Sequence, residues 1–313
     1  MAKGDRNDGP VGFVVVKKEA GWTSHDVVAK LRGILRQRRT GHAGTLDPSA
    51  TGVLVVGVGR ATRLLRFLQT TDKSYDGSFV LGSTTSTLDS DGEVTATFEM
   101  GSITHRQVVE AAASLTGEIL QVPPMVSAIK IDGQRLHELA RQGKEIDRPA
   151  RPVRIDSFTV TEGEGEGEYH FEVECSTGTY IRSLIDDLGA ALGGGAHVTS
   201  LRRTAVGPFS LNDGFTLQEI QDRVNEHQGD VVGAAILISP ANGLAAMERI
   251  TIGPNRLVQV ARGTVFPVGD FNLVTNGPYA AVDEDQTLLG VYEQTSFGTI
   301  KPSVIVMDQG GQQ

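Results

Sequence analysis

The order of its apolar runs constrains the fold of this chain more than any other feature of the sequence. Short β-branched or alternating runs, which suit strands, occur at 11–16, 53–58, 79–81, 94–98 and 169–176. Apolar residues at helical spacing occur at 24–35, 104–117 and 185–192. Strands and helices therefore do not alternate strictly along the chain. This order favours an α+β fold with a mainly antiparallel sheet over a doubly wound fold.

Hydroxyl residues mark where two of these helices begin. Thr23 is followed three residues later by Asp26, and Thr104 stands in the same relation to Gln107. In such a capping box the hydroxyl accepts a hydrogen bond from a backbone N–H of the first turn, and the later side chain accepts one from the backbone N–H of the cap residue. The sequence thus predicts helices that start directly after Thr23 and Thr104.

The length of 313 residues suits one large domain followed by a small one. The clearest boundary lies at 226–243. Short apolar runs separated by Gly, Asn and Asp follow it, at 250–252, 279–282, 288–292 and 303–307. We therefore expect a flexible N-terminus over 1–10, a large domain over 11–240, a small β domain over 245–307 and a frayed tail over 308–313.

Charge is distributed unevenly along the chain, whose formal net charge is −9. Residues 1–75 hold 13 Lys/Arg against 6 Asp/Glu, and the remaining residues hold 16 against 32. The basic end is a candidate surface for binding an anionic polymer, because phosphate binding depends on Lys and Arg. The same asymmetry also suits a chain that merely uses charge for solubility.

Cysteine usage and hydropathy indicate where the protein works. Cys175 is the only cysteine, which excludes an intrachain disulfide and a cysteine-based zinc or iron–sulfur site. The N-terminus is polar, and the apolar run after it ends at Lys17, which leaves no room for a signal-peptide core. The longest uncharged stretch, 231–247, is interrupted by Pro240 and is too short to span a bilayer. We expect a soluble, cytoplasmic protein that does not enter a membrane.

The most unusual segment is the loop GHAGTLDPSATG at 41–52, which lies between a basic helix and an apolar strand. Asp47 would be a carboxylate in an electropositive setting there, and such a carboxylate stays ionised. An Asp followed by Pro48 also suits an ordinary turn, and His42 also suits an ordinary loop histidine. The loop lacks the Gly-Lys-Ser/Thr of a Walker A phosphate cradle, so no nucleotide cofactor is implied.

A second polar segment, GTYIR at 178–182, places an aromatic ring and a guanidinium two residues apart at an expected strand end. On a strand, Tyr180 and Arg182 would point to the same face. The ring suits stacking on a base and the guanidinium suits holding a carboxylate or phosphate, although packing and a surface charge explain an isolated pair as well. Asp186 and Asp187 are neighbours on a helix and point about 100° apart, so they suit capping or solvation.

Taken together and in this order, these segments closely resemble the TruB family of bacterial tRNA pseudouridine-55 synthases, from about residue 12 to residue 211. The motifs are 41–52, DKSY at 72–75, PMVSAIK at 124–130, GTYIR at 178–182, DDLG at 186–189, GAHV at 195–198 and LRR at 201–203. Two positions depart from the family pattern. Glu19-Ala20 replaces a Pro after Lys18, and Val126 replaces an aromatic residue.

The resemblance implies roles for seven residues. Asp47 is expected to be the catalytic aspartate and Tyr75 to stack on the target uracil. Arg182 is expected to pair with Asp47, while Tyr180 and Leu201 line the pocket. His42 is expected to fill the space that the flipped base leaves in the tRNA T-arm, and Lys18 aligns with a lysine of the pocket region.

The implied reaction converts uridine 55 of the tRNA T-arm to pseudouridine. It breaks the N1–C1′ bond, rotates the freed uracil and joins C5 to C1′, so it needs no cofactor and no metal. Family-level proposals let the aspartate attack C1′, attack C6 or remove a ribose proton. The resemblance also implies a small C-terminal PUA-like RNA-binding domain and a monomer. The alternatives are a non-catalytic tRNA-binding or folding protein and a pseudouridine synthase that acts on another RNA.

Overall fold

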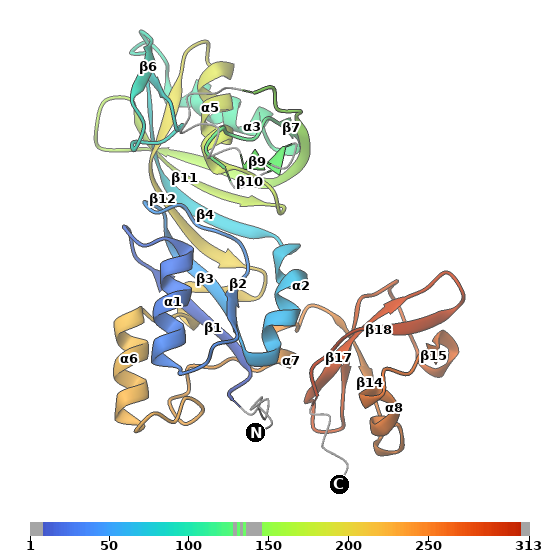
Figure 1. Ribbon diagram of the computed structural model, residues 1–313. Helices are drawn as coiled ribbons and strands as arrows, with labels where there is room; N and C mark the ends of the chain where they lie inside the picture. The colour runs from blue at the N-terminus through green and yellow to red at the C-terminus, as the bar shows by residue number, and fades with distance from the viewer. Residues whose placement is uncertain (1–8, 128–129, 132–133, 136–145, 308–313) are drawn as a thin grey trace.

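The computed structural model describes residues 9–127, 130–131, 134–135 and 146–307 (Figure 1). Three expectations therefore lie partly or wholly outside the described residues. They concern the flexibility of the first eight residues, the tail over 308–313, and residues 128–129 of the PMVSAIK motif.

A long, curved sheet forms the centre of the large domain (Figure 1). Its main path runs β1 (Gly12–Lys18), β3 (Thr51–Val58), β12 (Ala196–Val206), β4 (Lys73–Leu81), β11 (Glu168–Cys175), β10 (Arg151–Glu162) and β7 (Gly117–Gln121). The short strands β2 (Thr40–His42) and β13 (Phe209–Ser210) pair with β3 and β12. Two small hairpins are separate, β5 (Ser83–Thr85) with β6 (Val94–Thr97), and β8 (Lys130–Ile131) with β9 (Gln134–Arg135).

Strand pairing in the central sheet is antiparallel except at one junction. There β12 runs parallel to β3 over a short stretch, with Arg202 opposite Thr51 and Arg203 opposite Gly52. The prediction of an α+β fold with a mainly antiparallel sheet is confirmed. The parallel junction matters for the site because β3 follows the loop that carries Asp47.

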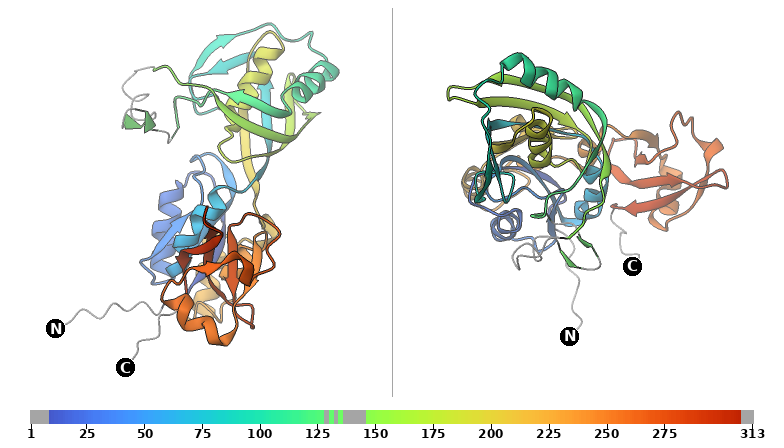
Figure 2. Two further views of the ribbon diagram at one scale, coloured as in Figure 1. Left: turned by 90° about the vertical axis from the view of Figure 1, so that its right-hand side faces the viewer. Right: turned by 90° about the horizontal axis from the view of Figure 1, so that it is seen from above.

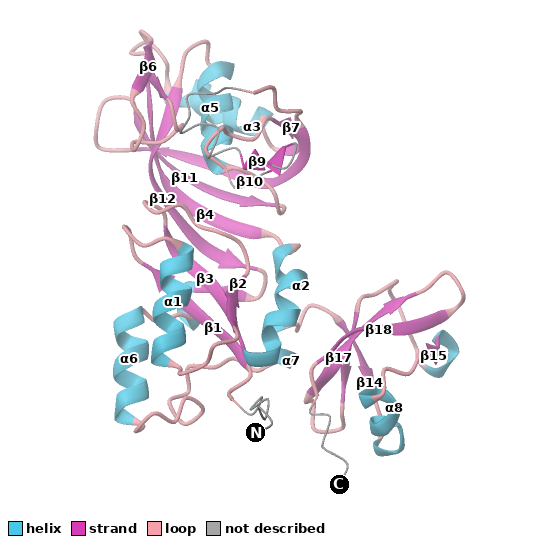
Figure 3. Cartoon of the chain, viewed as in Figure 1, coloured by secondary structure: helices cyan, strands magenta, loops and turns pink. Residues whose placement is uncertain are grey.

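Helices flank this sheet in two groups (Figure 3). The chain forms α1 (Ser24–Ile34), α2 (Leu65–Gln69), α3 (His105–Ser114), α5 (Ile181–Ala191), α6 (Leu217–Glu226), α7 (Pro240–Gly243) and α8 (Leu257–Ala261). Short 3-10 turns lie at Gly59–Leu64, Leu211–Asp213, Pro254–Arg256 and Val268–Asp270. Helices α1 and α6 lie beside β1 and β3, whereas α3 and α5 lie beside the half that contains β7 and β10.

Both predicted capping boxes are present. Thr23 caps α1 with Asp26, and Thr104 caps α3 with Gln107, each with the reciprocal pair of hydrogen bonds. Helix α1 then buries one apolar face, which includes Val27 and Leu31. That face packs in one cluster with alternate residues of β1 and β3.

Apolar packing divides the large domain into two halves. The other face of β1 and β3 packs in a second cluster with the 3-10 turn 59–64 and α2. In the second half, apolar residues of β4, β10 and β11 face α3 and α5 in a third cluster. The loop before β3 and the start of α5 meet where these halves join, and this junction contains the candidate site.

A second sheet forms the C-terminal part and lies beside the half that contains β1 and β3 (Figure 2). Its strands, in spatial order, are β14 (Glu248–Thr251), β16 (Tyr279–Val282), β17 (Leu288–Gln294), β18 (Thr299–Ile305) and β15 (Phe266–Pro267). Val282 and Val291 share an apolar cluster with Leu64 and Leu65. The PUA-like character of this sheet stays a prediction. In the part of the chain that the structure describes, no helix is long and apolar enough to span a bilayer.

Helix α5 contains the acidic pair Asp186 and Asp187, which is partly buried rather than fully solvated. Burial, and secondarily the neighbouring Asp186, raises the pKa of Asp187 to about 6, whereas burial alone raises the pKa of Asp186. The folded protein therefore holds a proton on Asp187 at a pH where the unfolded chain has lost it. The contribution of Asp187 to stability therefore falls as the pH rises from the usual pKa of 3.8 towards 6.

We expect Asp187→Asn to increase the free energy of unfolding at pH 8 by roughly 1–2 kcal/mol, after allowing for partial exposure. The amide takes the place of a carboxylate that must ionise in a partly buried position. At pH 3 the gain should largely vanish, because Asp187 is then mostly protonated in both states. Thermal melts across this pH range test the expectation, with the exposed Asp285→Asn as the matched control. A gain independent of pH would contradict the assignment to Asp187 ionisation.

Candidate active site

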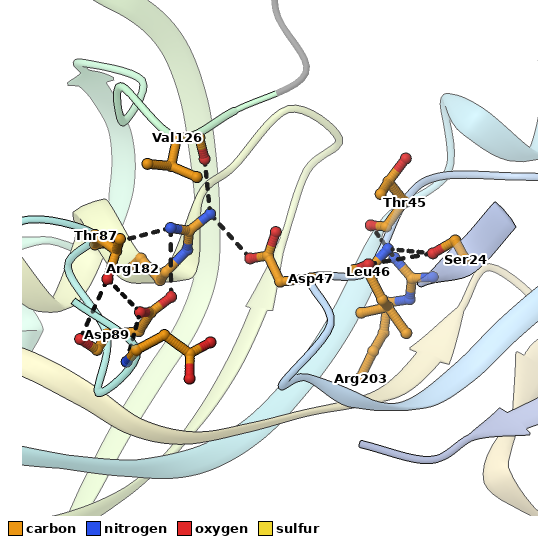
Figure 4. Close-up of polar contacts among 10 residues, drawn as sticks. Ser24, Thr45, Leu46, Asp47, Thr87, Asp89, Val126, Arg182 and Arg203 are labelled. Carbon is orange, nitrogen blue, oxygen red and sulfur yellow. Dashed lines mark hydrogen bonds and ion pairs between the residues drawn. The ribbon is translucent and has the colours of Figure 1, made fainter. Parts of the chain in front are cut away.

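The loop before β3 has no regular structure, yet donors from other elements hold its backbone (Figure 4). The Ser24 side chain, at the start of α1, accepts from the Leu46 N–H at 2.9 Å and donates to the Leu46 carbonyl at 3.2 Å. The Pro48 carbonyl accepts from the Gly21 N–H at 2.9 Å and from Lys18 Nζ at 3.1 Å. Asp47 therefore lies between two residues whose peptide groups are fixed.

The carboxylate of Asp47 points away from this backbone scaffold toward α5 (Figure 4). Arg182 Nη2 lies 2.9 Å from Asp47 Oδ2, an ion pair in which the Arg182 side chain is only 5% exposed. Arg182 is the second residue of α5, because Tyr180 is its extended N-cap residue. The expectation that Tyr180 and Arg182 share a strand is therefore wrong. The start of the helix turns the guanidinium into the pocket.

Arg182 also contacts three other groups. Its Nη1 lies 3.4 Å from Asp89 Oδ2 and donates to the Thr87 carbonyl at 2.7 Å, while Nη2 donates to the Val126 carbonyl at 2.9 Å. Asp89 is held in turn by the Thr87 hydroxyl at 2.5 Å. One guanidinium thus joins two carboxylates and two backbone carbonyls, which fixes its orientation.

Burial raises the pKa of Asp47, and the Asp89 charge raises it further. The charge and hydrogen bond of Arg182, and more weakly the charge of Lys18, lower it but do not outweigh burial. The side chain is still 40% exposed, so it faces a hollow that is open to solvent while protein atoms surround it. The cations near Asp47 therefore lower its pKa, as expected from an electropositive setting, but by less than burial raises it. A carboxylate with a raised pKa is a stronger base than an exposed one.

Asp47 faces a cavity of about 330 Å³, and this cavity brings together five of the seven predicted site residues. They are Asp47, Tyr75, Tyr180, Arg182 and Leu201. A volume of this size is within the range of pockets that bind small ligands. Among the described residues, no group of three or more His, Cys, Asp or Glu side chains is placed to hold a metal ion.

Two tyrosines contribute aromatic rings to the cavity wall. Tyr75 lies on β4, and burial raises its pKa against the opposing charge of Arg203. Burial also raises the pKa of Tyr180, whose backbone N–H donates to Gln121 Oε1 at 2.8 Å. Both phenols are therefore neutral at ordinary pH. Their apolar ring faces suit stacking against a planar base.

Lys18 does not line the cavity but lies beneath the loop. It is 2% exposed, and its Nζ donates to the Glu19 and Pro48 carbonyls at 3.0 and 3.1 Å. Burial lowers its pKa to about 8, although the nearby Asp47 charge acts in the opposite direction. In this position Lys18 holds the backbone of the loop next to Asp47 and does not face a ligand in the cavity.

His42 also lies outside the cavity wall, at the end of β2. Its ring packs edge-on against His25 of α1, with ring centroids 5.4 Å apart. Burial, followed by the charge of His25, lowers the pKa of His42, which favours its neutral form. The role of a wedge in RNA stays a prediction for this residue.

Sequence reasoning assigned no role to three polar residues of the site. Asp89 contacts Arg182 and belongs to none of the motifs that carried the family resemblance. Lys73 and Arg203 line the cavity, and both belong to motifs that carried the family resemblance. Lys73 Nζ donates to the Thr71 carbonyl at 2.7 Å, and burial lowers its pKa to about 8.

A larger hollow of about 640 Å³ lies near this site but lacks Asp47, Tyr75 and Arg182. It crosses β4, β10, β11 and β12 and is lined by polar side chains such as Asp76, His170 and Arg202. The smaller cavity remains the candidate active site because it contains the carboxylate, the guanidinium and both tyrosines.

Comparison with known proteins gives two matching family models. A model described as TruB family pseudouridylate synthase (N terminal domain) matches residues 32–181, and one described as tRNA pseudouridylate synthase B C-terminal domain matches residues 182–242. A relative from Corynebacterium efficiens named tRNA pseudouridine synthase B is 54% identical over 67% of this chain and 72% of its own length. A relative of that name from Mycobacteroides abscessus is 43% identical over 95% of this chain and 96% of its own length.

The fold is shared with a solved structure described as an H/ACA ribonucleoprotein bound to a substrate RNA containing 2′-deoxyuridine. The TM-score is 0.74 at 23% identity, and the alignment covers 96% of this chain and 86% of that chain. At this identity the likeness concerns the fold, whereas the matching models and the relatives concern the sequence itself. On that sequence evidence, the chain belongs to the TruB family of pseudouridylate synthases.

Proposed function

We propose that this protein converts uridine to pseudouridine at position 55 in the T-arm of tRNA. The observation that carries the proposal is the Asp47 carboxylate, which faces a cavity lined by two tyrosines and is paired with a buried arginine. The names of the relatives support tRNA as the substrate. A protein that only bound RNA would gain nothing from a carboxylate aimed at an anionic polymer.

The reaction is an isomerisation, so its atoms balance without a co-reactant. The N1–C1′ bond breaks, the uracil rotates and the C5–C1′ bond forms, after which C5 loses its proton and N1 gains one. Each proposed role for Asp47, attack on C1′, attack on C6 or removal of a ribose proton, requires an ionised oxygen. Arg182 would orient that oxygen. It would also favour the ionised form of Asp47, because it lowers the pKa that burial raises.

Access to the uridine requires that the base leave its stack, at a cost of a few kcal/mol. Tyr75 would replace the lost stacking, with Tyr180 and Leu201 completing the pocket wall around the base. His42 would fill the vacated space in the T-arm, because it lies at the end of β2, directly before the catalytic loop. Lys18 would support that loop through the Pro48 carbonyl.

The direct test is to incubate purified protein with an unmodified tRNA transcript and map pseudouridine along it. We expect a single new pseudouridine at position 55 without any added cofactor or metal. Modification only at other positions, or only in another RNA, would replace the proposed substrate. Binding without any pseudouridine would favour the alternative of a tRNA-binding or folding protein.

The basic residues near the N-terminus differ in how available they are for RNA. Arg63 donates to the Ile305 carbonyl at 2.8 Å, and Arg66 pairs with Glu293 at 3.2 Å, so both connect to the C-terminal sheet. In contrast, Arg36, Arg38 and Arg39 are exposed at the exit of α1, close to the site loop in the chain. We propose that the exposed group contacts tRNA phosphates.

Replacing all three arginines, Arg36, Arg38 and Arg39, by Glu should weaken tRNA binding by at least about 10-fold. The number of counterions released on binding, given by the slope of log affinity against log salt concentration, should fall by about two to three. Filter binding at several salt concentrations measures both quantities. The comparison variant replaces Arg249, Arg262 and Lys301, which are exposed on the C-terminal part and should weaken binding far less. Equal weakening by both triple variants would place the main RNA contacts elsewhere.

The remaining expectations about partners and location also belong to this proposal. The protein would act as a monomer in the cytoplasm, and the C-terminal sheet would be an accessory RNA-binding module. Its apolar cluster with Leu64 and Leu65 indicates that such a module would be held firmly against the large domain.

A further inference from the structure

Arg203 is a buried cation that the reaction outlined above does not use. It is 1% exposed, the largest of the fully buried side chains among the described residues. Its Nε donates to the Val53 carbonyl at 2.8 Å, Nη1 to the Thr45 carbonyl at 3.4 Å and Nη2 to the Gly44 carbonyl at 3.2 Å. Within the described chain no carboxylate forms an ion pair with it. Burying a guanidinium without a carboxylate partner lowers the stability of the folded protein. Its presence here therefore indicates a functional role.

The contacts of Arg203 are concentrated on the loop that carries Asp47 (Figure 4). Gly44 and Thr45 lie three and two residues before Asp47, and Val53 lies on β3 just after the loop. Arg203 therefore joins both ends of the loop through backbone carbonyls, while Arg182 holds the Asp47 carboxylate. A planar guanidinium with five N–H donors makes such divergent contacts, and an ammonium group does not reproduce this geometry.

Glycine at position 52 makes this placement possible. Arg203 is the parallel-strand partner of Gly52, whose φ is +101°. A Cβ atom on Gly52 would lie 2.2 Å from the Arg203 carbonyl oxygen, a distance that no side chain tolerates. The last glycine of the loop motif thus allows β12 to approach closely enough for the Arg203 side chain to pass beneath the loop.

Arg203 also connects the loop to the stacking tyrosine. It is the antiparallel partner of Tyr75 across β12 and β4. Both side chains line the candidate cavity, and the charge of Arg203 lowers the pKa of Tyr75 against the larger effect of burial. One side chain therefore contacts the backbone of the loop with the proposed catalytic carboxylate and lies on the strand position opposite the tyrosine of the proposed base platform.

We propose that Arg203 is a positioning residue that sets the Asp47 loop and the Tyr75 ring at a fixed separation around the target base. The proposal rests on the proposed function, in which Asp47 reacts and Tyr75 stacks. Arg203 touches no reacting atom. Loss of its fork of hydrogen bonds should misplace the reacting groups, with the RNA-binding surface left intact.

The neighbouring Arg202 offers a matched control on the same strand. Its side chain projects to the other face of the sheet, where Nε donates to Asp76 Oδ1 at 2.9 Å. It is 54% exposed and lines the larger hollow rather than the candidate active site. Arg202→Lys and Arg203→Lys make the same chemical change one residue apart on opposite faces.

The test measures single-turnover pseudouridine formation with saturating enzyme, tRNA binding by filter assay, and thermal unfolding. Assays run well below the melting temperature of each variant. We expect Arg203→Lys to slow turnover by at least about 10-fold while its Kd stays within about twofold of the wild-type value. Arg202→Lys should keep both values near wild type. A wild-type rate in folded Arg203→Lys, or a loss confined to Kd, would overturn the proposal.

A double-mutant cycle with Tyr75→Phe separates positioning from a general loss of stability. If Arg203 acts partly through the Tyr75 phenol, Arg203→Lys should cost at least about threefold less in the Tyr75→Phe background than in the wild-type background. If Arg203→Lys reduces the rate by the same factor in both backgrounds, the link to Tyr75 is overturned. If Arg203→Lys does not fold, Arg203→Gln, which keeps two N–H donors, enters the same cycle. Absence of pseudouridine formation by the wild-type protein would instead contradict the proposed function.

Discussion

Asp47→Asn should fold and bind tRNA but lose pseudouridine formation by roughly 1000-fold or more. The amide keeps the size of the side chain and removes the ionised oxygen that every proposed role requires. Binding should be unchanged or slightly tighter, because the carboxylate repels phosphate and the exposed arginines at the exit of α1 are untouched. Single-turnover assays with saturating enzyme, alongside filter binding, give both quantities.

The matched control for this change is Asp91→Asn, which removes an exposed carboxylate from the turn after Asp89. It tests whether loss of a negative charge near the site is enough to affect turnover. Near-normal turnover by Asp47→Asn would exclude Asp47 as the catalytic aspartate. Loss of tRNA binding by the same variant would show that Asp47 acts in recognition.

Arg182→Met should reduce single-turnover pseudouridine formation by on the order of 100-fold at neutral pH. The substitution removes the cation between Asp47 and Asp89, which lie 2.9 and 3.4 Å from its nitrogens. Since Arg182 lowers the pKa of Asp47 while burial and Asp89 raise it, the pKa of Asp47 must rise in the variant. A higher pH is then needed to ionise Asp47 to the same extent as in the wild-type protein.

The sign of this shift gives the variant a distinctive pH profile. Turnover by Arg182→Met should increase as the pH rises over a range in which wild-type turnover is already constant. Arg182→Lys should be less impaired, because it keeps the charge but loses most of the hydrogen bonds to Thr87 and Val126. A low rate with a wild-type pH profile would mean that Arg182 orients Asp47 without tuning its ionisation.

The sequence alone predicted the elements that are specified by residues close together in the chain, namely the starts of α1 and α3 and the strand β11. The hydroxyl of Thr23 and the carboxylate of Asp26 lie within one helical turn, so the start of α1 could be predicted without any tertiary contact. The same holds for Thr104 and Gln107 in α3. The alternation from Tyr169 onward likewise predicted β11, because side-chain direction on a strand has a period of two.

The candidate site could be predicted in composition but not in geometry. The loop motif and its resemblance to a family singled out Asp47, and the cavity contains five of the seven named residues. Nothing in the chain near Arg182 indicated that helix α5 begins one residue before it, so the side-chain direction was wrong. A difference of one residue at a helix start rotates a side chain by about 100°.

Only the tertiary structure decided which groups are partners. Asp89 and Arg203 reach the site across pairings of distant segments, and the sequence alone does not specify their distances from Asp47 or Tyr75. Burial, which depends on the whole packed domain, raises the pKa of Asp47 despite the basic residues around it in the chain. The sequence by itself determined the local elements and the family motif. Packing determined the side-chain directions, the contact partners and the direction of the pKa shift at Asp47, because each depends on contacts between residues far apart in the chain.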